Sequence, residues 1–183
     1  SLCNLSCGFS QTFLNKVRRD EITLNPNSGT KGDLELDRNN PCSWSCDSTA
    51  QWIKSVEGIE FEELVLLWRE QKLLEDIKKG VIHLIWTGGE PTLPQRQKEI
   101  SRFLKFFNDY SAIDSFNSEV YNEIETNGTI FIEQELFDQL QQINCSPKLA
   151  NSGMTKKQRI TPEAIKRIMS HSNYQFKFVV HTE

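Results

Sequence analysis

Apolar positions in this chain alternate between short continuous runs and longer amphipathic stretches. Residues 81–87 (Val-Ile-His-Leu-Ile-Trp-Thr) are mostly apolar and predict a buried strand. Three shorter apolar runs predict further strands, at 120–125, 143–146 and 174–180. The segments between and before them predict helices, at 48–55, 61–79, 95–109, 132–141 and 162–170. Thr161 and Pro162 are suited to begin the last of these helices.

Strands that alternate with helices indicate parallel βα units, so we expect an α/β fold. Polar residues follow three of the predicted strands, at 87–90, 125–127 and 146–148. Ligands of α/β sheets bind outside the carboxyl ends of the strands. These three segments are therefore expected to converge on one cleft.

Length and charge narrow the class of protein. The 183 residues are enough for one domain with a hydrophobic core, which we place over 1–183. The net charge of −4 argues against a protein that coats nucleic acid. No apolar run approaches the roughly 20 residues that span a bilayer, and no signal peptide precedes Cys3. We expect a cytoplasmic protein that binds neither nucleic acid nor a membrane.

The chain has no initiator Met, and its first cysteine is the third residue, so we expect it to be incomplete at both ends. Residues 8–45 are rich in turn-forming residues, as in Asn25-Pro26-Asn27-Ser28-Gly29. A loop of this length inside a compact domain is uncommon and usually functional. We interpret 8–45 as an insertion, with room for a short strand at 22–24.

Five cysteines in a chain of this kind favour metal ligation over disulfides. Cys145 follows an apolar stretch and is expected to be a small buried side chain. The others form two CxxxC pairs, Cys3 with Cys7 and Cys42 with Cys46. Three thiolates could hold a [4Fe–4S] cluster with one open iron, and all four could hold a structural zinc ion. Spacing alone leaves both interpretations open.

The predicted strand at 81–87 runs into Gly88-Gly89-Glu90-Pro91. Two glycines let a ligand approach the backbone, and Glu90 places a carboxylate beside it. Glu90 could orient a ligand ammonium or stiffen the loop, and a plain strand-ending turn is the alternative for the whole motif. Together with the cysteines at 3–7 and 46, the motif points to an iron–sulfur enzyme that binds S-adenosylmethionine.

The motifs CNLSC, CDS, TGGEPTL, ETNGT and SPKL occur in the order seen in radical S-adenosylmethionine enzymes of the 7-carboxy-7-deazaguanine synthase type, which this chain resembles from Cys3 to Val180. The resemblance implies a partial (β/α) barrel with a long insertion in the cluster-binding loop. It implies a carbon–nitrogen lyase that converts 6-carboxy-5,6,7,8-tetrahydropterin to 7-carboxy-7-deazaguanine in queuosine biosynthesis. A 5′-deoxyadenosyl radical would take hydrogen from C6 of the pterin, and the ring would contract with loss of ammonia. The family also implies a homodimer and an electron donor such as a flavodoxin or ferredoxin.

The resemblance further implies roles for single residues. Cys3, Cys7 and Cys46 match the cluster ligands, although the family's usual motif is a compact CxxxCxxC. Cys42 either replaces one of them or is a bystander in the loop. Thr87 matches a position that contacts substrate. Residues assigned to S-adenosylmethionine are Gly88, Gly89, Glu90, Ser146, Pro147 and Lys148, with Glu125 and Asn127 as further candidates for the cofactor cleft.

Ser48 stands where the family places a Thr whose hydroxyl binds Mg²⁺ beside the substrate carboxylate, and a Ser hydroxyl is an equally hard ligand. The alternative is that Asp47 or Ser48 caps the helix that begins there. For Asn127, the alternative to the cofactor cleft is a turn capped by Asn-Gly.

The remaining histidines and the tryptophans carry weaker evidence about function. His83 lies within an apolar run and is expected to be a core histidine, whereas His181 could reach a cleft. The tryptophans, Trp44, Trp52, Trp68 and Trp86, are expected to pack in the interior. Two alternative functions stay open: an activase that installs a glycyl radical, and a non-catalytic binding module stapled by zinc.

Overall fold

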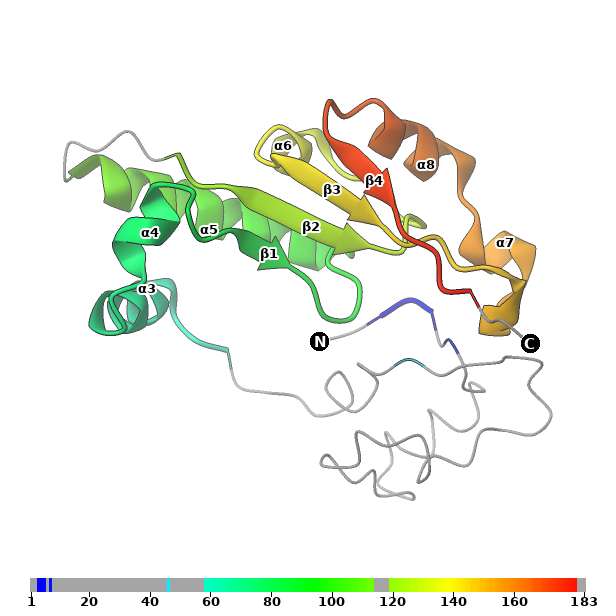
Figure 1. The fold of residues 1–183 in the computed structure, drawn as a ribbon, viewed down its shortest axis with the longest axis horizontal. Coiled ribbons are helices and arrows are strands. Elements are labelled where there is room, and N and C mark those ends of the chain that lie inside the picture. The colour runs from blue at the N-terminus through cyan, green and yellow to red at the C-terminus, as the bar shows by residue number, and fades with distance from the viewer. Residues whose placement is uncertain (1–2, 6, 8–45, 47–57, 114–118, 181–183) are drawn as a thin grey trace, which may run out of the picture.

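The computed structural model describes residues 3–5, 7, 46, 58–113 and 119–180. The predictions for 8–45, 22–24 and 48–55 therefore lie outside the described residues, as do those for Cys42, Trp44, Ser48, Trp52 and His181. The described helices and strands, in chain order, are α3 (Phe61–Glu70), α4 (Leu74–Lys78), β1 (Leu84–Trp86), α5 (Pro94–Ile113), β2 (Asn122–Thr126), α6 (Gln134–Phe137), β3 (Gln142–Cys145), the 3₁₀ turn η1 (Ala150–Ser152), α7 (Lys156–Arg159), α8 (Pro162–Met169) and β4 (Tyr174–Phe176) (Figure 1).

The strands form one four-stranded sheet in the order β1-β2-β3-β4, and every neighbouring pair is parallel. The pairs are parallel because each connection between consecutive strands contains a helix and returns the chain to the end of the sheet where the previous strand began. The prediction of an α/β fold with parallel βα units is confirmed.

Side chains alternate between the two faces of this sheet. Ile124 of β2 pairs with Ile143 of β3, and both are fully buried beneath the helices. Phe103 of α5 lies at the centre of this core, with the rings of Phe61 and Trp68 edge-on to it at 5.3 and 5.8 Å. These aromatic contacts attach α3 to α5 and stabilise the layer of helices against the sheet.

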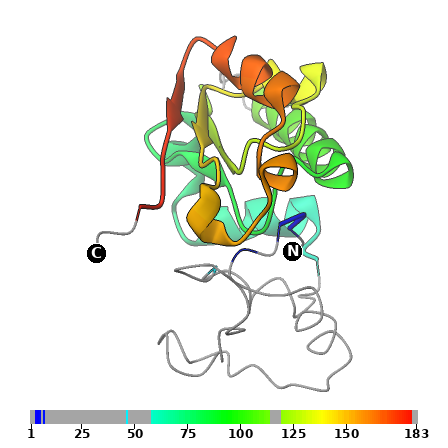
Figure 2. The same ribbon diagram turned by 90° about the vertical axis from the view of Figure 1, so that its right-hand side faces the viewer.

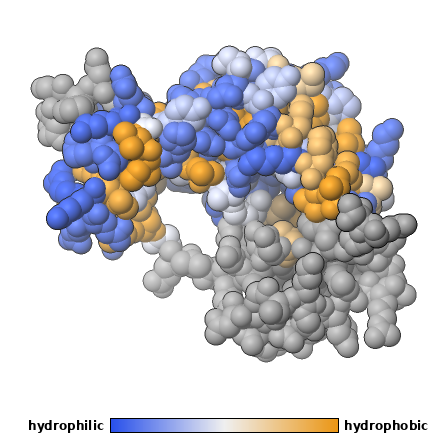
Figure 3. All heavy atoms as spheres, in the orientation of Figure 1, coloured by the Kyte–Doolittle hydropathy of each residue, from blue (hydrophilic) through white to orange (hydrophobic). Residues whose placement is uncertain are grey.

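The opposite face of the sheet is polar. Helices α5, α6 and α8 lie on one side of the strands (Figure 2), and the other side carries residues such as Glu123, Gln142 and Asn144. Hydrophilic residues dominate the centre of this open face, whereas hydrophobic ones gather toward β4 (Figure 3). Purely parallel sheets are usually covered on both faces by apolar contacts, so a polar open face is the less common arrangement.

Two helical predictions need correction, and one helix was missed. The helix predicted over 61–79 is two helices, because Lys72 adopts a left-handed conformation (φ 61°) that interrupts the helix between them. The helix predicted over 132–141 is shorter, at Gln134–Phe137, and α7 was not predicted.

Of the helices in the described ranges, none combines the length and apolar character needed to span a bilayer.

Candidate functional site

The loop after β1 is fixed by the side chain of Glu90, which is fully buried. Its Oε1 accepts hydrogen bonds from the backbone N–H of Thr92 (3.0 Å), the Thr92 hydroxyl (2.6 Å) and the Thr126 hydroxyl (2.7 Å). Its Oε2 accepts from the backbone N–H of Asn127 at 2.8 Å. Both oxygens are thus engaged by protein donors, and Glu90 joins the loop after β1 to the end of β2. These contacts favour the loop-stiffening role that the sequence left open.

The two glycines before Glu90 are both left-handed, with φ of 85° at Gly88 and 70° at Gly89. A Cβ placed on Gly88 would meet no atom within 4 Å, so space lies open beside this backbone. This conformation favours glycine because it costs other residues steric strain. The turn therefore presents bare backbone at the carboxyl end of β1.

The turn after β2 binds the first cysteine segment. The Asn127 side chain donates to Oδ1 of Asn4 at 2.9 Å and accepts from the backbone N–H of Thr129 at 3.0 Å. Asn4 in turn donates to the Thr129 hydroxyl at 2.7 Å. The segment that carries Cys3 and Cys7 is therefore held at the carboxyl ends of the strands (Figure 1). Asn4 and Thr129 were not predicted as site residues.

The predicted cluster ligands lie near one another. The backbone N–H of Cys46 donates to the carbonyl of Cys7 at 3.1 Å. Burial is the main cause that raises the pKa of Cys7 to about 12; the Lys148 ammonium acts to lower it, and the neighbouring Cys46 and Cys3 act to raise it. Burial likewise raises the pKa of Cys3, and its effect outweighs the hydrogen bond from the Leu5 N–H, which lowers it. Within the described ranges, no three His, Cys, Asp or Glu side chains are close enough together to hold a metal ion.

The segment after β3 extends the same edge. The backbone N–H of Ser146 donates to the carbonyl of Thr126 at 2.7 Å, so the β2–β3 pairing continues past the end of β3. Lys148 donates to the Ser146 hydroxyl at 3.3 Å, and its carbonyl accepts from Arg159 of α7 at 3.2 Å. Pro147 between them is buried. This segment thus fixes Lys148 close to the thiols of Cys3 and Cys7.

A second polar group lies at the same edge on the open face. Glu125 accepts a hydrogen bond from the Thr87 hydroxyl at 3.0 Å. It also forms an ion pair with Lys177 at 3.3 Å. The backbone N–H of Lys177 donates to the carbonyl of Cys145 at 2.8 Å. Lys177 was not predicted as a site residue, because the strand predicted over 174–180 included it, whereas β4 ends at Phe176 and Lys177 directly follows it.

Cys145 itself is fully buried, as predicted, and burial raises its pKa to about 12. Trp68 and Trp86 pack against the core, also as predicted. Together, the described candidates from the loops after β1, β2 and β3 gather at the carboxyl edge of the sheet.

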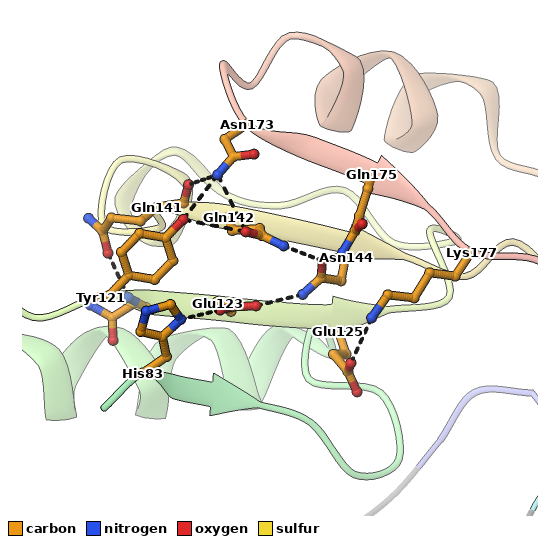
Figure 4. A network of polar contacts seen from close by, with 11 residues as sticks. His83, Tyr121, Glu123, Glu125, Gln141, Gln142, Asn144, Asn173, Gln175 and Lys177 are labelled. Atoms are coloured by element: carbon orange, nitrogen blue, oxygen red, sulfur yellow. Dashed lines mark hydrogen bonds and ion pairs between the residues drawn. The ribbon is translucent and has the colours of Figure 1, made fainter. Parts of the chain in front are cut away.

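The prediction that His83 is a core histidine is wrong. Its side chain is 41% exposed and bonds Glu123 through Nδ1 at 2.5 Å (Figure 4). Its ring stacks on Tyr121 with the centroids 4.0 Å apart. Strand alternation places residue 83 on the open face, because Leu84 is the residue that points into the core. Burial acts to raise the pKa of Glu123, but hydrogen bonds from His83 and Asn144 hold it below its usual value.

One cavity lies away from this edge of the sheet. A mostly apolar cavity of about 810 Å³ runs beside β1, between α3 and the start of α5. Its lining includes Ile59, Phe61, Trp86 and Phe103, and among the predicted site residues only Thr87. The polar edge described above is the better candidate for chemistry, because that is where the thiols and the charged groups lie.

No family model matches the chain, and neither a curated protein nor a solved structure does so. Function is therefore inferred from the residues of this edge and from the motifs that they form.

Proposed function

We propose that the protein is a radical S-adenosylmethionine lyase that converts 6-carboxy-5,6,7,8-tetrahydropterin to 7-carboxy-7-deazaguanine. The observation that supports this most is the linkage of the motifs in space. A hydrogen bond between Asn4 and Asn127 connects the first cysteine segment to the turn after β2. A hydrogen bond between Glu90 and Asn127 connects that turn to the loop after β1. Thiols and a bare glycine backbone are thereby assembled at one edge, as such an enzyme requires.

The chemistry of the donors fits an iron–sulfur cluster. Cys3, Cys7 and Cys46 offer three soft ligands and would leave one iron open for the amino and carboxylate groups of methionine. Lys148 favours the thiolate form of Cys3 and Cys7. Because burial keeps these thiols protonated, ligation must release protons, and it must also draw the sulfur atoms together. When bound and reduced, such a cluster would supply the electron for reductive cleavage of S-adenosylmethionine.

The surrounding residues would bind and orient S-adenosylmethionine. Space lies open beside the backbone of Gly88, and the carbonyls of Gly88 and Gly89 would receive the methionine ammonium. Ser146, Pro147 and Lys148 would flank the cofactor on the other side. Asn127 would act mainly by holding the cysteine segment, since its amide already bonds Asn4 and Thr129. Exclusion of water from this edge would protect the radical.

We extend the proposal to the finer fold. Four parallel strands in sequential order, with helices on one face and polar side chains on the other, support a partial (β/α) barrel whose polar face points inward. In such a barrel, Thr87 would contact substrate from the end of β1. The proposal also includes Mg²⁺ held by Ser48. The protein would act in the cytoplasm as a homodimer and would be reduced by a flavodoxin or ferredoxin.

The proposal is tested by anaerobic reconstitution with iron and sulfide, on the wild type and on Cys42→Ala and Cys46→Ala. We expect about four irons per chain and broad absorption near 400 nm, as a [4Fe–4S] cluster gives. Both should persist in Cys42→Ala and be lost in Cys46→Ala. The reconstituted protein should then form 7-carboxy-7-deazaguanine, detected by mass spectrometry. A colourless protein with one zinc ion, lost in Cys42→Ala, would instead identify a zinc-stapled module.

A further inference from the structure

Thr87, Glu125 and Lys177 form one connected group at the carboxyl ends of three different strands. Thr87 directly follows β1, Glu125 is in β2, and Lys177 directly follows β4. All three side chains meet on the open face of the sheet, where Figure 4 shows the ammonium of Lys177 pointing to the carboxylate of Glu125. A ligand that lies against this face beside the cysteine segment would meet this group.

The ion pair between Lys177 and Glu125 is accessible, and both side chains can form further hydrogen bonds. The side chains of Lys177 and Glu125 are 52% and 44% exposed, so a ligand can reach both. An ammonium can donate three hydrogen bonds, and Lys177 donates one of its three to Glu125. The Glu125 carboxylate accepts one bond at each oxygen, from Thr87 and from Lys177, and has further lone pairs.

The positions of these atoms are defined by the sheet. The backbone N–H of Lys177 is tied to the carbonyl of Cys145, and Thr87 holds the second oxygen of Glu125. A cationic donor and an anionic acceptor thus stand 3.3 Å apart. The complementary ligand carries an anionic acceptor and an N–H donor at a similar separation, which a carboxylate and a nitrogen on the same carbon provide.

We propose that Lys177 and Glu125 bind an α-amino-carboxylate unit, with Lys177 on the carboxylate and Glu125 on the N–H. This inference rests on the proposed function, whose substrate contains such a unit: C6 of the tetrahydropterin carries both the carboxylate and N5–H. Recognition of these two groups would orient C6, the carbon that loses hydrogen. Besides its proposed contact with substrate, Thr87 positions Glu125 through the hydrogen bond from its hydroxyl.

The methionine of S-adenosylmethionine carries the same unit, so the test separates the two ligands. Binding is measured by anaerobic calorimetry on the cluster-loaded protein without reductant, so that no turnover occurs. The probes are 6-carboxytetrahydropterin, tetrahydropterin without the carboxylate, and S-adenosylmethionine. The variants are Lys177→Met and Lys177→Arg. The matched control is Lys105→Met, which alters an exposed lysine of α5 on the covered side.

We expect the wild type and Lys105→Met to bind the carboxylated pterin about tenfold more tightly than its analogue, as a charge-assisted bond would give. Lys177→Met should lose this preference, Lys177→Arg should keep part of it, and S-adenosylmethionine should bind all variants equally. A preference retained in Lys177→Met would overturn the inference and leave the proposed function standing. Weaker S-adenosylmethionine binding in Lys177→Met, with the pterin preference unchanged, would assign the pair to methionine instead. A cluster-loaded wild type that binds neither pterin would overturn both proposals.

Discussion

Glu90 is a buried carboxylate whose neighbours are all donors. One oxygen faces the N–H of Thr92 and the other faces the N–H of Asn127. In Glu90→Gln, the side-chain NH₂ must face one of these N–H groups, and a buried donor loses its acceptor. We expect the free energy of unfolding to fall by about 1–3 kcal/mol, measured by urea denaturation.

The matched control is Glu125→Gln, which alters an exposed carboxylate of β2 next to Thr126, a residue that bonds Glu90. Exposed ion pairs contribute little, so the change there should stay within about 1 kcal/mol. Equal losses in the two variants would contradict the structural role assigned to Glu90.

Two glycines at the candidate site share a left-handed backbone and differ in their surroundings. A Cβ on Gly128 would lie 2.6 Å from the sulfur of Cys145, whereas one on Gly88 meets nothing. Gly88→Ala should therefore cost roughly 1–2 kcal/mol for the backbone alone. Gly128→Ala should cost about 1–3 kcal/mol more because of the clash, as urea denaturation would show.

The double variant Gly128→Ala/Cys145→Ala provides the check on this explanation. Removing the sulfur makes room for the new methyl group, so the combined loss should be smaller than the sum of the single losses. Strict additivity would place the strain somewhere other than at the sulfur of Cys145.

At the scale of elements, the junction between α3 and α4 is the clearest departure from the apolar pattern. Helical spacing of Leu64, Leu67, Trp68 and Leu74 is compatible with one long helix, yet the helix is interrupted at Lys72, whose backbone is left-handed. The backbone N–H of Leu73 donates to the carbonyl of Trp68 at 2.8 Å, five residues back, which closes α3. A left-handed residue at this place is usually glycine.

Lys72→Gly should for that reason stabilise the protein by up to about 1 kcal/mol, since glycine adopts φ of 61° without strain. Lys72→Val should lower the melting temperature, because a β-branched residue tolerates this conformation least. Both are measured by thermal denaturation, with Lys79→Gly as the control. Lys79 is also a helix-terminal lysine, but its φ is −87°, so glycine should bring no gain there.

The sheet was predictable from the sequence and the helix boundaries were only partly so. Strands such as Leu84–Trp86 appear as apolar runs between turn residues, although only Leu84 of this strand is buried and Ile85 is exposed, and parallel pairing follows from the helices between them. The break at Lys72 has no glycine or proline to mark it. The exposure of His83 depends on which residues of a short run face the core, and the composition of the run does not determine that.

At the scale of the whole molecule, the motif residues could be predicted to gather, whereas the contacts that hold them together could not. Ligands bind at the carboxyl ends of parallel strands, which places Glu90, Asn127 and Ser146 at one edge. The contact between Asn4 and Thr129 joins residues 125 positions apart, and no local pattern indicates it. The same holds for Lys177 and Glu125, which are 52 positions apart.

Docking of the cysteine segment onto the sheet leads to a prediction about the coupling between cluster binding and stability. A ligand that binds only the folded state stabilises it, by about 2.7 kcal/mol at one hundred times its dissociation constant. For a chain of this size, such a gain raises the melting temperature by about 5–10 °C. Cluster loading of the wild type should produce a rise of this order in anaerobic thermal denaturation.

Asn127→Ala should reduce both the iron content after reconstitution and the thermal gain on loading, because it removes the hydrogen bond from this side chain to Asn4. The matched control is Asn144→Ala, another buried asparagine of the same sheet, whose amide bonds Glu123 on the open face instead. Both variants lose buried hydrogen bonds and should be less stable without iron by similar amounts, about 1–3 kcal/mol. Only Asn127→Ala should lose iron, since it alone frees the cysteine segment. If the two variants took up iron equally, the turn after β2 would support the fold without positioning the cluster ligands.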